Sequence, residues 1–367
     1  MGETPMAKSV DNDNGLSPGP HVERPTLAEL ARAAGVNKST ASRALRGNRA
    51  IGTETRERIQ QLAAELNYEP NASARRLFRA QTDVLAFTSP SLTRGNDGAD
   101  PFLAELLSAV TSEAARYHQD VLLCNTQAGP EELETYRRVV GGHHADGLIL
   151  MDLRPDDPRL EYLRAKGYPH VLFGRSALDM EEARHYAYPW VEVDNRAGAR
   201  AGTRHMIELG HTRIGFLGAD EAYICELDRL AGYRDTLAAA DIPYDSGLCT
   251  EGGITQEDGY RLTRHLLERA EPPTAIFAAS DVLAVGAMRA AADAGRTVGR
   301  EFPVIGFDDL GLATFVSPSL TTLRQPIEYA GRMLVRLLIG MLRGTPEPEA
   351  HLLLQPELIV RDSTRRA

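Results

Sequence analysis

The sequence is poor in cysteine and tryptophan and has no long hydrophobic run. Its 367 residues include only 3 Cys and 1 Trp. The three cysteines are widely spaced, which argues against a disulfide framework or a cysteine-based metal site and favours a reducing compartment. The most apolar helix-like stretch, 333–342, is interrupted by Arg336 and is too short to cross a bilayer. The first twenty residues lack an apolar signal core, so we expect a soluble, cytoplasmic protein that has no contact with a membrane.

Catalytic and cofactor-binding motifs are also missing. The chain has no G-x-S-x-G, no Walker loop, no H-E-x-x-H and no G-x-G-x-x-G. His143 and His144 are adjacent, but two neighbouring imidazoles without further spaced ligands are typical of surface residues rather than of a metal site. We therefore expect no enzyme activity, no cofactor and no metal.

Charge is divided unevenly along the chain. The net charge is −10, yet residues 24–80 hold eleven Lys and Arg against five Asp and Glu. The acidic surplus therefore lies in the much longer stretch 81–367. A small basic head on an acidic body indicates that only the head meets a polyanion, because the body repels it.

The basic head has the pattern of a helix, a glycine turn and a second helix. Thr26 and Glu29 form a capping box, which predicts a helix that ends at Gly35. A second helix is predicted over about 38–46 and a third over about 53–67, before a proline that disfavours helix in the preceding residue.

The second helix of the head carries small polar and basic side chains, as a helix that reads DNA bases does. Asn37 is its expected N-cap. Arg43 is a candidate for bidentate contact with a guanine edge, whereas Arg46 is better placed for a phosphate, which gives affinity without sequence choice. The predicted DNA-contacting residues of this helix are Asn37, Lys38, Ser39, Thr40, Ser42, Arg43 and Arg46.

From residue 82 onward, short apolar runs alternate with amphipathic segments. The apolar runs lie at 84–87, 121–123, 147–150, 170–173, 191–193, 214–217, 275–277 and 304–307. Buried strands that alternate with helices predict parallel sheets with helices on both faces. Two series of four or five strands predict two similar lobes, which bind ligands in the crevice beyond the carboxyl ends of the strands.

Two stretches of the head, 34–43 and 66–77, resemble the lactose/galactose repressor family of bacterial transcriptional regulators. The family pattern is A-G-V-S-x-x-T-V-S-R followed by L-x-Y-x-P-N-x-x-A-x-x-L. This chain departs from it only mildly, at Asn37 and Ala41. Further segments of the body, such as 208–216 and 305–309, are similar to the family's sensor core.

The resemblance implies an all-α helix-turn-helix head joined to an α/β sensor like the periplasmic sugar-binding proteins. That sensor has two doubly wound parallel-sheet lobes. The expected organisation is a disordered tail at 1–23, the DNA-binding domain at 24–69, a hinge helix and linker at 70–81, and the effector-binding and dimerisation domain at 82–367. Lobe one is expected at about 82–190 and 326–354, and lobe two at about 191–325 and 355–367, with crossings near 190, 325 and 355.

A hinge helix that folds only on the operator is implied for residues 71–78. Leu77 would be the wedge pushed between base pairs in the minor groove, with Asn71 and Ala74 as further contacts. Such a wedge costs unstacking energy that the bent duplex offsets through added contacts. Because two hinge helices are needed side by side, the resemblance implies a homodimer on near-palindromic double-stranded DNA.

The resemblance also implies an effector pocket. Arg229 and Asp308 match the family's ligand-binding arginine and aspartate, and the other implied effector-binding residues are Ser91, Phe102, Arg175 and Ser280. Ile254 stands where many members carry a stacking aromatic side chain, so Phe102 or Trp190 is expected to substitute. Asp194 and Asp281 are each interpreted either as helix N-caps or as ligand contacts.

These features predict a ligand-responsive repressor of sugar uptake or catabolism genes that a carbohydrate effector releases. One alternative is a repressor that needs a purine-like corepressor. A stand-alone small-molecule-binding protein is another, but the head at 26–78 counts against it. The sequence does not show whether DNA binding represses or activates transcription, so an activator is also an open alternative.

Overall fold

The computed structural model describes residues 25–45, 47–48, 50–68, 81–89, 100–126, 131–176, 188–218, 222–250, 252–345 and 347–365. The chain divides into two compact units, 1–80 and 81–367, and each is described here by itself. The expected tail at 1–23 and the expected hinge helix at 71–78 lie outside the described residues.

The described part of the first unit contains three short helices around a small apolar core. They are α1 (Leu27–Ala33), α2 (Lys38–Leu45) and α3 (Thr53–Glu65), and their buried side chains include Leu30, Ala34, Ala44, Ile59 and Ala63. The predicted capping box is confirmed, because the N–H of Glu29 donates to Thr26 Oγ1 at 3.3 Å and the N–H of Thr26 donates to Glu29 Oε2 at 2.7 Å. Gly35 follows α1 with a φ of +62°, which glycine adopts readily and which lets the chain turn into α2.

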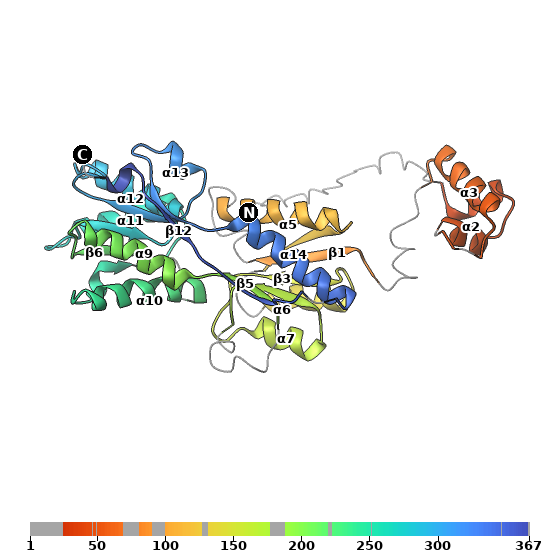
Figure 1. Ribbon diagram of the computed structural model, residues 1–367, viewed down its shortest axis with the longest axis horizontal. Coiled ribbons are helices and arrows are strands. Elements are labelled where there is room, and N and C mark those ends of the chain that lie inside the picture. Colours follow the sequence, from red (N-terminus) through yellow and green to blue (C-terminus); the bar gives the residue numbers. More distant parts are fainter. Residues whose placement is uncertain are drawn as a thin grey trace, which may run out of the picture. The chain divides into compact units, whose positions relative to one another are not determined.

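The second unit begins with a six-stranded parallel sheet, which forms lobe one (Figure 1). The strands lie in the order β11-β5-β4-β3-β1-β2. In chain order they are β1 (Val84–Ser89), β2 (Asp120–Asn125), β3 (Gly147–Leu150), β4 (His170–Phe173), β5 (Trp190–Val193) and β11 (His351–Leu354). Alternate side chains of a strand point to opposite faces, so Leu85 and Phe87 pack with helices α5 (Pro101–Arg116) and α14 (Ile327–Arg343). Val84 and Ala86 pack instead with α6 (Glu132–Gly141) and α7 (Pro158–Lys166).

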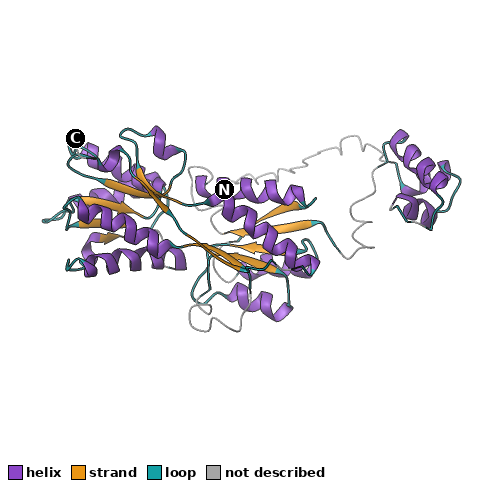
Figure 2. Ribbon diagram, in the orientation of Figure 1, coloured by secondary structure: helices purple, strands orange, loops and turns teal. Residues whose placement is uncertain are grey.

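Lobe two repeats this plan with a second six-stranded sheet (Figure 2). The strand order is β12-β10-β9-β8-β6-β7, and only the β10–β12 pair is antiparallel. The strands are β6 (Ile214–Leu217), β7 (Cys249–Thr250), β8 (Ala275–Ala278), β9 (Val304–Asp308), β10 (Thr321–Arg324) and β12 (Glu357–Ile359). Helices α9 (Asn195–Glu208) and α10 (Ile224–Ala239) cover one face, and α11 (Gln256–Leu267) and α12 (Asp281–Asp293) cover the other. The short α13 (Leu312–Phe315) follows β9, and 3₁₀ turns lie at Ser246–Leu248 and Asp362–Thr364.

The chain passes between the lobes three times. β5 pairs with β4 and β11 and therefore belongs to lobe one, so the first passage follows Val193, close to the expected position near residue 190. The other two passages lie between β10 and α14 and between β11 and β12. The apolar stretch at 333–342 is part of α14, and within the described residues no helix is both long and apolar enough to span a bilayer.

Candidate functional site

A cavity of about 530 Å³ lies between the two lobes, at the carboxyl ends of their parallel strands. Residues 151–153 and 173–175, which follow β3 and β4, line it from lobe one. Ser280 and Asp308, after β8 and at the end of β9, line it from lobe two. This is the crevice in which open α/β sheets bind small molecules, and its volume is in the range of ligand pockets.

Five of the six predicted effector-binding residues come together in this cavity. Phe102, Arg175, Arg229, Ser280 and Asp308 all line it, although they are up to two hundred positions apart in the sequence. The sixth, Ser91, lies outside the described residues.

Arg229 is buried on α10 and is held firmly by the protein. Its Nε donates to Asn195 Oδ1 at 2.9 Å, and its Nη1 donates to Glu226 Oε1 at 2.9 Å and to the carbonyl of Ala279 at 2.8 Å. The guanidinium carbon also lies 4.1 Å from the centroid of the Phe307 ring. Three of the five guanidinium N–H groups are thus used within the protein, which fixes the position of the guanidinium at the cavity.

Asp308 is a buried carboxylate at the end of β9. Gln325 Nε2 donates to its Oδ1 at 2.6 Å, and its backbone has a φ of 123°, a strained value for a residue other than glycine. Burial raises the pKa of Asp308 well above its ordinary value, although the positive charge of Arg229 opposes this shift. A carboxyl group in this setting accepts hydrogen bonds readily from ligand hydroxyl groups.

Arg175 joins the two lobes through an ion triad. It follows β4 and donates to Glu192 on β5 of the same lobe, and its Nη2 donates to Asp228 Oδ2 on α10 of the other lobe at 3.1 Å. Burial raises the pKa of Glu192 to about 7, although Arg175 opposes the shift, and burial also raises the pKa of Asp228. Sequence reasoning missed both acids, although a glutamate inside the apolar run at 190–193 was a usable signal.

Ser280, Asp281 and Asp194 each act on local structure. Ser280 caps α12 by accepting the N–H of Leu283 at 3.2 Å, and it also lines the cavity. Asp194 caps α9, which confirms one of its two interpretations. For Asp281 the cap interpretation is wrong: its carboxylate is fully buried and accepts from the N–H of Leu310 at 2.8 Å and from a threonine hydroxyl on β10.

The aromatic wall of the cavity comes from lobe one. The rings of Phe102 and Phe173 lie with centroids 6.0 Å apart, and both side chains line the cavity opposite Ile254. Trp190 does not substitute for an aromatic residue at position 254, because it stacks on His351 with centroids 5.0 Å apart and lies outside the lining.

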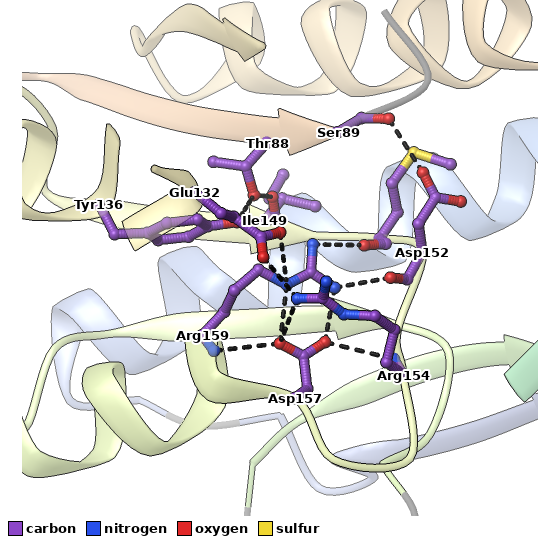
Figure 3. A network of polar contacts seen from close by, with 10 residues as sticks. Thr88, Ser89, Glu132, Tyr136, Ile149, Asp152, Arg154, Asp157 and Arg159 are labelled. Atoms are coloured by element: carbon purple, nitrogen blue, oxygen red, sulfur yellow. Dashed lines mark hydrogen bonds and ion pairs between the residues drawn. The ribbon is translucent and has the colours of Figure 1, made fainter. Parts of the chain in front are cut away.

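A fully buried arginine, Arg159, supports the lobe-one wall (Figure 3). Its Nε and Nη2 donate to the two carboxylate oxygens of Asp157 at 2.8 and 2.6 Å. Its Nη1 and Nη2 also donate to the carbonyls of Met151 and Asp152 at 3.1 and 2.6 Å. Glu132 adds a second buried carboxylate 3.6 Å from Nε. The network fixes the turn after β3, whose side chains line the cavity.

The same turn makes a direct backbone contact across the cleft. The N–H of Ile224, at the start of α10 in lobe two, donates to the carbonyl of Leu153 in lobe one at 2.9 Å. This bond and the pair between Arg175 and Asp228 both depend on the relative position of the lobes, so a ligand that changes this position has to change these contacts.

In the first unit, α2 presents the predicted DNA-reading surface. Asn37 Oδ1 accepts from the N–H of Thr40 and from the hydroxyl of Ser39, both at 2.7 Å, so it caps the helix as expected. The side chains of Lys38 and Arg43 are exposed, whereas Ala41 and Ala44 on the other face are buried in the three-helix core. Of the remaining predicted contacts, Ser42 is half-buried on α2, and Arg46, Asn71, Ala74 and Leu77 lie outside the described residues.

A residue that sequence reasoning missed holds these helices together. Arg58 on α3 donates from Nη2 to the carbonyl of Ala34 at 2.7 Å, which ties the turn before α2 to the third helix. The head is thus a helix-turn-helix unit whose second helix offers its polar face to solvent. Together with a two-lobed sensor, it defines a ligand-responsive, DNA-binding transcriptional regulator.

Comparison with known proteins assigns the family. Residues 26–71 match the model described as bacterial regulatory proteins, lacI family, and residues 203–364 match the periplasmic binding protein-like domain. The chain is 34% identical to the HTH-type transcriptional regulator CelR of Thermobifida fusca, over 93% of this chain and 98% of that protein. It is also 34% identical to the regulator AglR of Rhizobium meliloti (strain 1021), over 92% and 94%. The chain belongs to the lacI family.

Solved structures agree with this assignment. The lac repressor dimer bound to operator and the anti-inducer ONPF matches with a TM-score of 0.81 at 26% identity, over 94% of this chain and 100% of that chain. The complex of CelR with cellobiose matches with a TM-score of 0.69 at 32% identity, over 93% and 100%. The expectation of a transcriptional regulator rather than an enzyme is confirmed.

Proposed function

We propose that this regulator represses sugar uptake or catabolism genes and is released from its operator by a carbohydrate that binds between the lobes. The observation that carries the proposal is the chemistry of the cavity. Carboxyl groups from both lobes and side-chain amides from lobe two surround it, and the rings of Phe102 and Phe173 form an apolar wall. Sugars present hydroxyl groups at their edges and C–H groups on their ring faces, which suits such a lining.

A relative with a known ligand supports a sugar as the effector. A solved structure of CelR contains cellobiose, and CelR and AglR are both 34% identical to this chain. The repressor PurR of Mannheimia succiniciproducens is a more distant match at 28% identity, so the purine-like corepressor is the second candidate.

The proposed mechanism is a shift between two arrangements of the lobes. A bound sugar contacts both walls of the cavity and competes for Arg175, which now joins the lobes through its bond to Asp228. The shift is limited by the difference in the sugar's affinity for the two arrangements. Transmission through a hinge helix at 71–78, action as a homodimer on a near-palindromic operator, and a cytoplasmic location are part of the proposal.

A two-stage experiment tests the proposed function. A thermal-shift screen of sugars and purines against the full-length protein identifies binders, because a ligand of the native state raises its stability. Fluorescence anisotropy with labelled operator DNA, at fixed salt, then measures the effect of each binder on DNA affinity. We expect a sugar to raise the melting temperature and to weaken operator binding. A purine that binds and tightens operator binding, with no response to sugars, contradicts the proposal.

A further inference from the structure

The lining of the cavity is rich in carboxyl groups on both sides. Five carboxylates line it against two arginines, Arg175 and Arg229. The carboxylates are Asp100, Asp152 and Glu192 from lobe one and Glu226 and Asp308 from lobe two. Among the described residues that line the cavity there is no lysine or histidine.

Neither arginine offers an unpaired positive charge to a ligand. Arg175 is paired with Glu192 and with Asp228, and Arg229 is paired with Glu226 at 2.9 Å. A phosphate or carboxylate usually binds where a guanidinium or an ammonium has no other counter-charge. Among the described lining residues, an anion therefore meets carboxyl groups on both walls and no cation that lacks a counter-charge.

Three helix N-termini at the cavity are capped by side chains, whereas α10, which also starts there, has no side-chain cap. Backbone N–H groups at a helix start often hold phosphate. Here Asp100 caps α5 by accepting the N–H of Phe102 at 3.0 Å, Ser280 caps α12, and Thr255 caps α11 as part of a capping box with Asp258. Two of these three helix starts thus already carry a negative charge of the chain's own.

We propose that the cavity selects an uncharged polyhydroxylated ligand and rejects the phosphorylated or carboxylated form of the same sugar. The inference rests on the proposed function and narrows it to neutral sugars. Hydroxyl groups donate to the carboxylates and accept from Arg229 and from side-chain amides, so they satisfy the lining without adding a negative charge. Asp228 is a positioning residue for this selectivity, because it takes up part of the charge of Arg175 without itself lining the cavity.

Isothermal titration of the full-length protein tests the inference with matched ligands. Neutral sugars, cellobiose and maltose among them, are compared with their aldonic acids and their 6-phosphates at 0.1 and 0.5 M salt. We expect a neutral sugar to bind roughly a hundredfold more tightly than its anionic forms, as one added like-charge contact in a partly desolvated site produces. The ratio between the affinities for the neutral and the anionic forms should be smaller at 0.5 M salt than at 0.1 M salt.

Variants on one helix separate selectivity from general damage. Asp228→Asn removes one counter-charge of Arg175 and should reduce the neutral-to-anionic ratio to about tenfold, as expected for weakening a single close ion pair. Asp228→Glu should keep the ratio of the original protein. The matched control is Asp235→Asn on the same helix, because Asp235 pairs with Arg196 and Arg200 at the surface. The control should leave the ratio unchanged.

Each outcome has a separate meaning. If a neutral sugar binds and its anionic forms bind equally or more tightly, the inference is overturned while a carbohydrate effector stands. If no sugar of either kind binds and a purine does, the proposed function and the inference fall together. If Asp228→Asn keeps the neutral-to-anionic affinity ratio of the original protein, Asp228 plays no part in selectivity.

Discussion

Replacing Arg159 by leucine should destabilise the sensor unit strongly. The arginine side chain is 1% exposed and pairs with Asp157, which is also 1% exposed, while Glu132 is 3% exposed. The substitution leaves two buried carboxylates with only Arg154, 19% exposed, as a counter-charge. Removing one partner of a buried ion pair costs about 3–5 kcal/mol of unfolding free energy. For a unit of this size, that loss lowers the melting temperature by roughly 6–15 °C.

The assay is thermal and urea unfolding of the full-length protein, followed by circular dichroism. Arg137→Leu is the matched control, because Arg137 pairs with Glu134 on the surface of α6, with side chains 54% and 66% exposed. An exposed pair of this kind contributes at most about 1 kcal/mol, so the control should unfold close to the original protein. Ligand affinity should also fall in Arg159→Leu, since the arginine holds the carbonyls of the turn after β3.

The reasoning fails if Arg159→Leu loses less than about 1 kcal/mol, because a buried network would then behave as surface pairs do. One part of the reasoning also fails if the free energy of unfolding drops but the folded Arg159→Leu protein binds its ligand as tightly as the original protein. In that case the network supports the lobe but does not position the cavity wall.

Three further predictions concern both units. Asn37→Ala should destabilise the head by about 1 kcal/mol, measured by thermal unfolding of the helical signal, because the N–H of Thr40 loses its acceptor. Arg43→Ala should relax discrimination at one base pair of the operator by about 1–3 kcal/mol, measured with single-base operator variants at fixed salt. Glu192→Gln should make the free energy of unfolding depend less on pH. The pKa of Glu192 is raised to about 7 in the folded protein from 4.5, so its stabilising contribution is complete below pH 4.5 and is lost as the pH rises through 7. Urea unfolding at pH 5 and pH 8 should show a smaller difference in Glu192→Gln than in the original protein, and an equal difference contradicts the shift.

Much of the fold could be predicted because the apolar pattern is local. The runs at 84–87, 147–150 and 214–217 are strands, since parallel strands buried on both faces are apolar throughout. The strands at 351–354 and 357–359 were not predicted. Their side chains are half-buried or exposed, as expected at the edge of a sheet, so they lack the buried apolar run that marks a central strand.

The site was predictable where a motif carried it or where a residue follows a predicted strand, as Arg175 does. Arg229 was found because it stands in R-L-A-G, and the structure shows a packing reason for the glycine of that motif. A Cβ at Gly232 would lie 2.4 Å from the carbonyl oxygen of Arg196, so only glycine lets α10 approach α9 this closely. Glu192 and Asp228 belong to no such motif. Their importance comes from pairing across the lobes, which sequence spacing does not contain.

The distribution of carboxylates explains how a neutral ligand can act on the lobes. Asp100 and Glu192 face the cavity from one lobe, and Glu226 and Asp308 face it from the other. Removing water from carboxyl groups on opposite walls costs free energy and so opposes a closer approach of the lobes, and burial already raises the pKa of Asp100, Glu192 and Asp308. A ligand whose hydroxyl groups donate to both walls replaces that water and removes the opposition, so it binds the closed arrangement more tightly than the open one. A coupling of about 1–3 kcal/mol, which a few such hydrogen bonds supply, is enough to change the affinity at a second site by roughly five- to 150-fold.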